Sequence, residues 1–472
     1  MNNKQRTNTK TRIAKKSTGK KLLKLESKYC SWGDTVHYVK KPNIFEKAEG
    51  SYLYDNKGVE YLDLQMLYSA VNFGYRNERI SSALRNQIDR LPQLACQYLH
   101  EEKIKLATNL AQRINRTFEE KGRIQFNVGG SAAIEDSLKL VRNHTGRTLM
   151  FAFMGGYHGR TLAASAITSS FRYRERYGHF GDRAMFIPYP YCFRCPYEKK
   201  KESCGLYCLK QFEKLFETEY YAVVNNKTRN CEFSAFIIEA IQGTGGYVIP
   251  PKDYFSGLKK ILDRYNILMV DDEVQMGFYR TGKFWAIEHF GITPDIIVFG
   301  KSMTNGMNPL SGLWAREKLI TPEVFPPGST HCTFASNPLG TALGLEVMKL
   351  IDESDFAAEV NKKGKYFLSR LKALKKKYPQ IGDVDGLGLA IRIEMCQKDG
   401  FTPDKKLTNE IEEIGLSGKL TAGGKKRGLV LDVGGYYKNV FTLAPCFYIT
   451  RKEIDLAVDL FEEALKKALK KV

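Results

Sequence analysis

Short runs of apolar residues recur between residues 120 and 315, each followed by a polar residue or a glycine and then by helical periodicity. This alternation is typical of strand-then-helix units that build a buried, mainly parallel sheet. The expected strands are 123–126, 148–153, 235–238, 267–270 and 296–299, and the expected helices are 133–143, 254–265 and 340–351. The pattern therefore predicts an α/β fold that binds its ligand beyond the carboxyl ends of the strands.

Different patterns flank this block. Residues 48–64 alternate apolar and polar positions around an Asp-Asn-Lys-Gly turn, which predicts a hairpin. Residues 356–378 and 454–469 have the periodicity of amphipathic helices, and 387–395 that of a strand. We therefore expect one smaller α+β domain formed by both chain ends, residues 29–75 and 346–472. The large domain is expected to span 76–345, with an insertion at 187–209.

The charge is uneven along the chain. The sequence has 73 Lys and Arg against 52 Asp and Glu, a net charge of +21, and residues 1–21 carry eight of these cations and no acid. Residues 1–28 are expected to form a basic disordered tail, with a transit peptide or a contact to a polyanion as alternatives. No apolar run is long enough to span a membrane. Without a secretory hydrophobic core, we expect a cytoplasmic protein.

Ten cysteines in such a compartment are expected to be reduced. Four of them, Cys192, Cys195, Cys204 and Cys208, form a C-x2-C-x8-C-x3-C pattern inside the insertion. Two pairs at short spacing are able to hold a tetrahedral zinc ion. The alternative is a loop in which the thiols are packed, and we assign no metal-ligating residue.

The strongest chemical signal is an acid and a lysine, each at the end of an apolar run. Asp272 stands in "ILMVDDEVQMGFYRTG" and Lys301 in "DIIVFGKSMTNG". A partly desolvated lysine loses its proton more easily and forms a Schiff base with a carbonyl. A facing carboxylate keeps a pyridine nitrogen protonated. Pyridoxal 5'-phosphate requires these two groups and is the expected cofactor, although either residue alone fits an ordinary salt bridge at the rim of the sheet.

Two further motifs suit the phosphate and the aromatic ring of such a cofactor. In "RIQFNVGGSAAIEDSLKLVR" an expected strand leads through Gly130 and Ser131 into a helix, so backbone N–H groups and a hydroxyl can bind a phosphate. An ordinary helix cap is the alternative. In "FMGGYHGRT", Tyr157 or His158 can stack on a heteroaromatic ring beyond a strand end.

Together with "IIEAIQGTGG" and "STHCTFASNPLG", these motifs resemble the class III (subgroup II) pyridoxal-phosphate-dependent aminotransferases, the group of the ornithine and 4-aminobutyrate aminotransferases. The similarity covers roughly residues 45 to 465 in order. It implies the fold type I of pyridoxal-phosphate enzymes and a homodimer with shared active sites. Spaced motifs of this kind are specific.

The resemblance implies a role for each residue of a cofactor site. Lys301 is the Schiff-base lysine and moves the proton between the substrate Cα and C4′ of the cofactor, and Asp272 pairs with the pyridine nitrogen. The other implied contacts are Gln275 with the ring hydroxyl, Gly130 and Ser131 with the phosphate, Tyr157 and its neighbour His158 with the ring, Glu239 near the cofactor, and Thr333 with the phosphate of the neighbouring subunit.

The sequence also departs from the family. A switchable ion pair of glutamate and arginine in the ornithine and 4-aminobutyrate enzymes is replaced by Thr244 and Thr442. Losing both partners leaves no orphan charge, but it removes the usual clamp for an α-carboxylate. Arg392 is a candidate substitute, with a structural salt bridge as the alternative.

These patterns predict an aminotransferase that moves an amino group from an amine, diamine or ω-amino acid to a 2-oxo acid by a ping-pong mechanism. Some relatives with a similar cysteine insertion are racemases, so an amino-acid racemase or epimerase is the alternative. Racemisation needs a second acid, and Thr244 is a poor one. An idle member of the family that binds polyanions through its basic surface is the third hypothesis.

Overall fold

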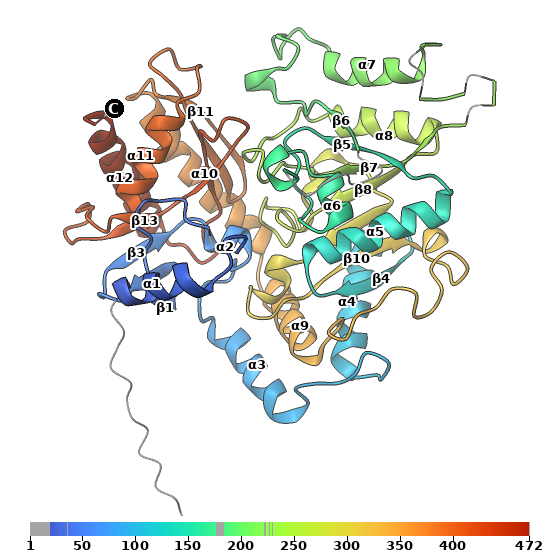
Figure 1. Cartoon of the computed structure of the whole chain (residues 1–472), viewed down its shortest axis with the longest axis horizontal. Helices are drawn as coiled ribbons and strands as arrows, with labels where there is room; N and C mark the ends of the chain where they lie inside the picture. The colour runs from blue at the N-terminus through green and yellow to red at the C-terminus, as the bar shows by residue number, and fades with distance from the viewer. Residues whose placement is uncertain are drawn as a thin grey trace, which may run out of the picture.

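The computed structural model describes residues 19–34, 36–175, 184–220, 223–225, 227–228 and 230–471. Figure 1 shows a large part built around one sheet and a smaller part that combines elements from the beginning and the end of the chain. Most of the expected basic tail lies outside the described residues, but residues 19–28 belong to helix α1 (Gly19–Tyr29). No helix among the described residues is long and apolar enough to cross a membrane.

A seven-stranded sheet organises the large part. Its strand order is β4-β10-β9-β8-β7-β5-β6. The strands are β4 (Gly122–Asn127), β5 (Leu149–Phe153), β6 (Met185–Ile187), β7 (Phe233–Ile238), β8 (Leu268–Asp272), β9 (Ile296–Phe299) and β10 (Ser311–Arg316). The run from β9 to β6 is parallel, so the five expected strands and the mainly parallel sheet are confirmed.

Two strands were not indicated by the sequence. Strand β6 is only three residues long, and β10 runs antiparallel to both β4 and β9. The apolar pattern of β10 is interrupted by Gly312, and this glycine is needed there because a Cβ would lie 2.5 Å from the carbonyl oxygen of Gln125. The close approach of the β4 backbone requires a glycine at this position. This glycine interrupts the run of apolar residues by which the strand could have been predicted.

The sheet is buried on both faces, as the apolar runs predict. Alternate residues of β7 enter two different cores: Ala235 and Ile237 pack on the side of α5, whereas Phe236 and Ile238 pack on the side of α8. The helices of the large part are α3 (Glu78–Arg90), α4 (Glu101–Phe118), α5 (Gly130–Thr145), α6 (Leu162–Ala166), α7 (Tyr207–Glu213), α8 (Tyr254–Arg264) and α9 (Pro338–Asp352). Helices packed on both faces of the sheet therefore hold the ends of its strands in place.

The smaller part contains two sheets, in the orders β1-β2-β3-β13 and β11-β12-β15-β14; the first combines strands from both ends of the chain, and the second is formed by C-terminal strands. The expected hairpin is confirmed as the antiparallel pair of β2 and β3, and β13 adds to β3 in parallel from the far end of the sequence. Their strands are β1 (Phe45–Glu49), β2 (Tyr52–Asp55), β3 (Glu60–Asp63), β11 (Ile381–Leu387), β12 (Ala390–Met395), β13 (Gly428–Val430), β14 (Asp432–Gly434) and β15 (Val440–Leu443). The helices beside them are α2 (Met66–Ser69), α10 (Phe356–Lys375), α11 (Lys405–Leu416) and α12 (Arg451–Leu469).

Candidate active site

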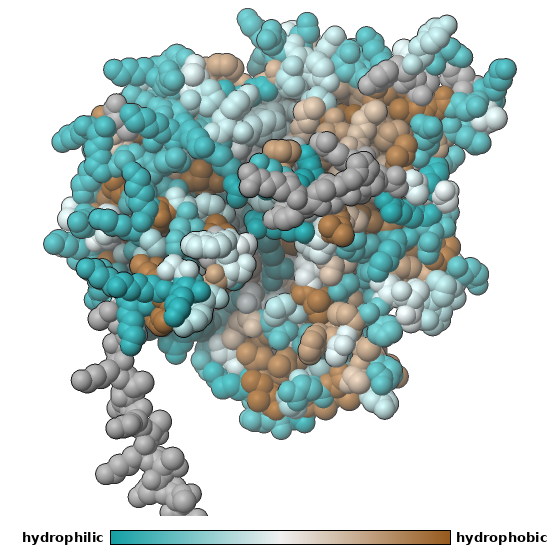
Figure 2. Space-filling model, viewed as in Figure 1, coloured by the Kyte–Doolittle hydropathy of each residue, from teal (hydrophilic) through white to brown (hydrophobic). Residues whose placement is uncertain are grey.

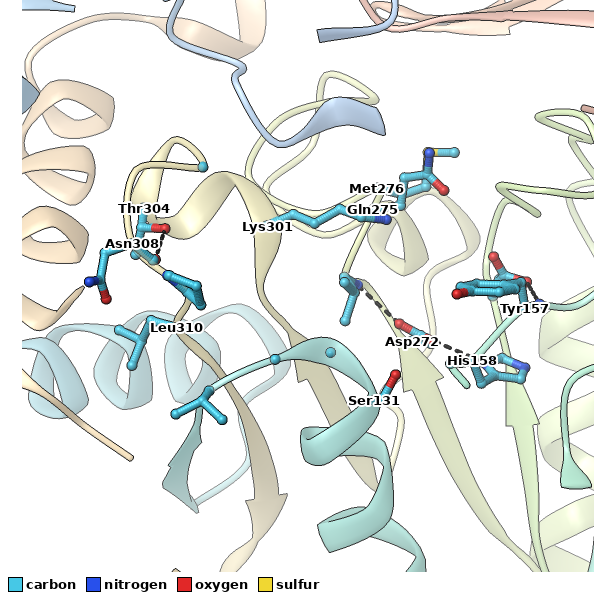
Figure 3. Close-up of a pocket in the computed structure, with 18 residues that line it drawn as sticks. Ser131, Tyr157, His158, Asp272, Gln275, Met276, Lys301, Thr304, Asn308 and Leu310 are labelled. Atoms are coloured by element: carbon cyan, nitrogen blue, oxygen red, sulfur yellow. Dashed lines mark hydrogen bonds and ion pairs between the residues drawn. The ribbon is translucent and has the colours of Figure 1, made fainter. Parts of the chain in front are cut away.

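A cavity of about 340 Å³ opens beyond the carboxyl ends of β8 and β9 and beside the N-terminus of α5. Eight of the nine residues expected in a cofactor site line it: Gly130, Ser131, Tyr157, His158, Glu239, Asp272, Gln275 and Lys301. Figure 3 shows Lys301 extending across the cavity toward Gln275, with Ser131 and Asp272 on neighbouring walls. Thr333 does not line it and is exposed before α9.

Lys301 begins the short 3-10 helix η5 (Lys301–Thr304) directly after Gly300, which follows β9. Its backbone has a φ of +43°, which is uncommon for a side chain other than glycine and typical of functional positions. Burial lowers the pKa of the Lys301 ammonium, while the charges of Asp272, Glu239 and Asp432 oppose this shift. The amine therefore loses its proton more easily than an exposed lysine does, which suits attack on a carbonyl.

Asp272 ends β8 and is held in place on both sides. Its carboxylate accepts hydrogen bonds from the backbone N–H of Val274 at 3.1 Å and from Nδ1 of His158 at 2.8 Å. Burial by itself lowers the pKa of His158, but the hydrogen bond and the charges of Asp272 and Glu239 outweigh it and raise that pKa. The protonated form of the His158 imidazole is therefore stabilised by the Asp272 carboxylate that it contacts.

This finding changes the role expected for His158. The sequence placed it beside Tyr157 as a possible stacking residue, but its buried imidazole supports Asp272 instead. The ring of Tyr157 packs edge-on against Tyr173, with centroids 5.1 Å apart. Of the two aromatic residues, Tyr157 therefore remains the one that can cover a ring in the cavity.

Glu239 positions two backbone segments of the site. Its carboxylate accepts hydrogen bonds from the backbone N–H of Tyr157 at 3.1 Å and of Gly243 at 3.0 Å. Burial raises the pKa of Glu239 to about 7, and the charge of Asp272 acts in the same direction. This side chain therefore connects the Tyr157 loop with the turn after β7.

The N-terminus of α5 provides a site for an anion. Gly129 occupies the capping position without a side-chain cap, so the first N–H groups of the helix remain available. Ser131 follows at the first turn, and its hydroxyl oxygen accepts a hydrogen bond from the backbone N–H of Arg160 at 3.3 Å. Gly159 lies against it with a φ of +135°, and a Cβ there would be 2.2 Å from Ser131 Oγ.

Replacing Gly159 with alanine is therefore expected to displace Ser131 and weaken cofactor binding by about 10-fold, a loss of about 1.4 kcal/mol, comparable to one hydrogen bond to a charged group. Equilibrium dialysis of the cofactor measures the change. Gly291→Ala is the matched control, because Gly291 also has a positive φ, +63°, but has nothing within 4 Å of its would-be Cβ. Equal cofactor affinity in the two variants would contradict the proposed contact.

The residues of the cavity fit pyridoxal 5'-phosphate. The uncapped helix N-terminus suits the phosphate, the carboxylate of Asp272 suits a protonated pyridine nitrogen, and the lysine with a lowered pKa suits the aldehyde. Gln275 lines the same cavity and donates a hydrogen bond to the hydroxyl of Tyr247 at 3.2 Å, which leaves its amide oxygen for a further partner. The cavity volume also suits a small cofactor.

Two lining residues were not indicated by the sequence motifs. Thr304 donates a hydrogen bond to the carbonyl oxygen of Asn308 at 2.6 Å, and the side-chain oxygen of Asn308 is buried without a partner. Thr304 ends η5 and Asn308 lies in the loop that follows, where no sequence pattern separates binding residues from ordinary turn residues. Only the folded chain brings them to the cavity.

The four cysteines of the insertion gather around one small cavity of about 20 Å³. All four are free thiols, and burial raises the pKa of Cys208 to about 11 and also raises that of Cys192. In the described part of the chain, no group of three or more His, Cys, Asp or Glu side chains is arranged to hold a metal ion. Burial therefore favours the protonated thiols of Cys192 and Cys208, as in a packed loop.

Arg392 does not take part in binding an α-carboxylate. It lies on β12 and pairs with the fully buried Glu394, which also accepts hydrogen bonds from Tyr191 and Arg194 of the insertion and from Asn439 at 3.2 Å. Two arginines therefore surround one buried carboxylate. Arg392 therefore forms the structural salt bridge that was the alternative expectation. The cluster around Glu394 connects the insertion to β12.

Glu394→Ala is expected to lower the free energy of unfolding by about 3–5 kcal/mol, because it leaves two arginines without their buried counter-charge. Chemical denaturation measures this change. The control Glu410→Ala removes a more exposed ion pair with Lys471 and should cost less than about 1 kcal/mol. Similar losses in both variants would show that the Glu394 cluster does not stabilise the fold.

Comparisons with known proteins show the family of the chain. The model of the family "Aminotransferase class-III" matches residues 35–465. The chain is 34% identical to a leucine/methionine racemase of Thermococcus litoralis over 90% of each chain, and 31% identical to an alanine/serine racemase of Pyrococcus horikoshii over 95% of this chain and 91% of the relative. It is 29% identical to the 4-aminobutyrate aminotransferase GabT of Escherichia coli, over 90% of this chain and 94% of the relative.

The fold of the chain also matches that of a solved structure. The crystal structure of a Bacillus anthracis aminotransferase superposes with a TM-score of 0.83 and 25% identity, covering 95% of this chain and 98% of the other. The match therefore extends over the large sheet and the smaller part alike. The chain belongs to the class-III aminotransferase family, pyridoxal-phosphate-dependent transaminases of fold type I.

Proposed function

We propose that this enzyme transfers the amino group of an amine, diamine or ω-amino acid to a 2-oxo acid, in two half-reactions that share one site. The observation that carries the proposal is that Lys301 and Asp272 line the same cavity. Pyridoxal phosphate, when bound, supplies an electron sink for the substrate Cα. Lys301 would hold the cofactor covalently and move the proton at that carbon, and Asp272 would hold the pyridine nitrogen.

The remaining residues would orient the cofactor. Gly130 and Ser131 would bind its phosphate, Gln275 its ring hydroxyl, and Tyr157 the face of its ring. Glu239 would keep the Tyr157 loop in position, since it accepts the Tyr157 N–H. The proposal is tested by adding a panel of amines, diamines and ω-amino acids to the loaded protein. Conversion of the cofactor absorbance to the pyridoxamine form supports it, and no conversion with any donor contradicts it.

We also propose a homodimer that acts in the cytoplasm and has shared active sites. Thr333 is exposed and would reach the phosphate in the neighbouring subunit. Large side chains, Ile88, Tyr98 and Leu99 among them, are exposed where α3 passes into α4. Figure 2 shows hydrophobic residues gathered at the lower end of the molecule, as is typical of an interaction surface. All ten cysteines are free thiols, which suits a reducing compartment. A monomeric mass by light scattering would contradict the dimer.

Racemisation is the second candidate, because the relatives at 34% and 31% identity are named as racemases. Incubation with a single L-amino acid in deuterated water separates the two. Deuterium at Cα with inversion and without a 2-oxo acid indicates a racemase. Formation of the oxo acid without inversion indicates transamination, which the weakly acidic hydroxyl of Thr244 favours.

A further inference from the structure

Asp432 is an acidic side chain that the site described above does not use. It begins β14, directly opposite Thr442 of β15 in the strand register. Its carboxylate accepts a hydrogen bond from the hydroxyl of Thr442 at 2.6 Å and a longer one from the side-chain amide of Gln65 at 3.4 Å. Both partners are neutral. The side chain is only partly shielded from solvent.

The strand that carries Asp432 packs against the wall of the cofactor cavity. The backbone N–H of Gly435 donates to the carbonyl oxygen of Thr244 at 3.0 Å, and a Cβ on Gly434 would lie 3.1 Å from the same oxygen. The preceding Gly243 approaches Gln275 so closely that a Cβ would be 2.1 Å from its side-chain oxygen. The turn that contains Gly243 and Thr244 therefore lies between the end of β14 and the cofactor site.

The charge of Asp432 reaches the reactive amine. It is one of the three carboxylates that oppose the lowering of the Lys301 pKa by burial. It also adds to the effect of burial in raising the pKa values of Tyr68 and Tyr247, which come from different parts of the chain. Asp432 lies two residues before Gly434 on the same strand, so its side chain leaves β14 on the face that a Gly434 Cβ would turn toward Thr244.

No cation in the described part of the chain forms an ion pair with Asp432. The ammonium of Lys438 also acts on it electrostatically, but Lys438 donates instead to the carbonyl oxygen of Val433 at 3.5 Å. Burial raises the pKa of Asp432, so the folded protein disfavours its charged form. A cation that binds beside Asp432 would stabilise the charged carboxylate and so offset the free-energy cost of burying it.

We propose that Asp432 is the specificity-determining residue that binds a positively charged group at the far end of the amino donor. The inference rests on the proposed function and narrows it: the preferred donors are those with a second ammonium group, such as diamines. Thr442, Gln65 and Thr244 present only neutral groups beside Asp432. A donor with a carboxylate at its far end would therefore meet repulsion from Asp432.

The test compares three donors of equal chain length, pentane-1,5-diamine, pentan-1-amine and 5-aminopentanoate, in half-reactions of the loaded protein. Wild type should favour the diamine over the monoamine, and Asp432→Asn should lower the ratio of kcat/KM for the diamine to kcat/KM for the monoamine about 10- to 100-fold. It should also improve the use of 5-aminopentanoate. Asp432→Glu keeps the charge and should retain the preference. Asp459→Asn removes an exposed charge on α12 and should change nothing.

A binding measurement separates this inference from the proposed function. Calorimetry of pentane-1,5-diamine with Lys301→Ala should show at least about 10-fold tighter binding than with Lys301→Ala/Asp432→Asn. If donors react but Asp432→Asn leaves both the donor ratio and the diamine affinity unchanged, the role of Asp432 is wrong. If no donor reacts although the diamine still binds through Asp432, the proposed function is wrong and the inferred cation site stands.

Discussion

Lys301→Ala is expected to lower the rate of each half-reaction by about 10⁴-fold, at the upper end of what a positioned proton-transfer group supplies. The side chain extends across the cavity, and nearby charges and burial adjust the pKa of its amine. Its removal takes away both the covalent attachment of the cofactor and the group that moves the proton at Cα. Single-turnover absorbance measurements with saturating cofactor and donor give the rate.

Lys283→Ala is the control for this variant. Lys283 is exposed and does not line the cavity. It should react at the wild-type rate. Retention of more than about one-tenth of the wild-type rate by Lys301→Ala would contradict the assigned role, since a general acid–base group contributes at least about 10²-fold.

Asp272→Asn is expected to lower the rate by about 10²- to 10³-fold, the effect of removing one preorganised electrostatic contact. The hydrogen bond from His158 and the N–H of Val274 can persist with asparagine, but the negative charge that holds a protonated pyridine nitrogen is lost. The bound cofactor should then show an altered absorbance spectrum before any donor is added. Stopped-flow spectra measure both effects.

Asp459→Asn, at an exposed position on α12, controls for the loss of one negative charge. Its spectrum and rate should match the wild type. If Asp272→Asn has the wild-type spectrum and loses less than about 3-fold in rate, the pyridine nitrogen is not held by this carboxylate, because the loss would be far below that of an electrostatic contact.

The sheet and most of the cofactor residues could be predicted because each depends on local sequence. Apolar runs locate strands buried on both faces, and polar residues directly after them, such as Asp272 and Lys301, meet at one edge for purely geometric reasons. The uncapped Gly-Gly-Ser turn before α5 is equally local. These residues could therefore be placed in the site from their positions at the end of a strand or at the start of a helix.

Other parts depend on contacts between distant segments. His158 changed from a stacking candidate to a partner of Asp272 because β8 brings that carboxylate beside it. Arg392 pairs with Glu394 two residues along the same strand, and only the folded chain shows that Tyr191 and Arg194 of the insertion contact the same carboxylate. Asp432 stands in a short strand whose relation to Lys301 depends on how the two parts of the fold meet.

Peptide mapping after borohydride reduction of the loaded protein tests the central claim most directly. Reduction fixes the bond between a lysine and pyridoxal phosphate, and mass spectrometry then locates the added group. We predict one phosphopyridoxyl group per chain, on Lys301. Its presence on a different lysine, or on none, would contradict the cofactor site and the function proposed from it.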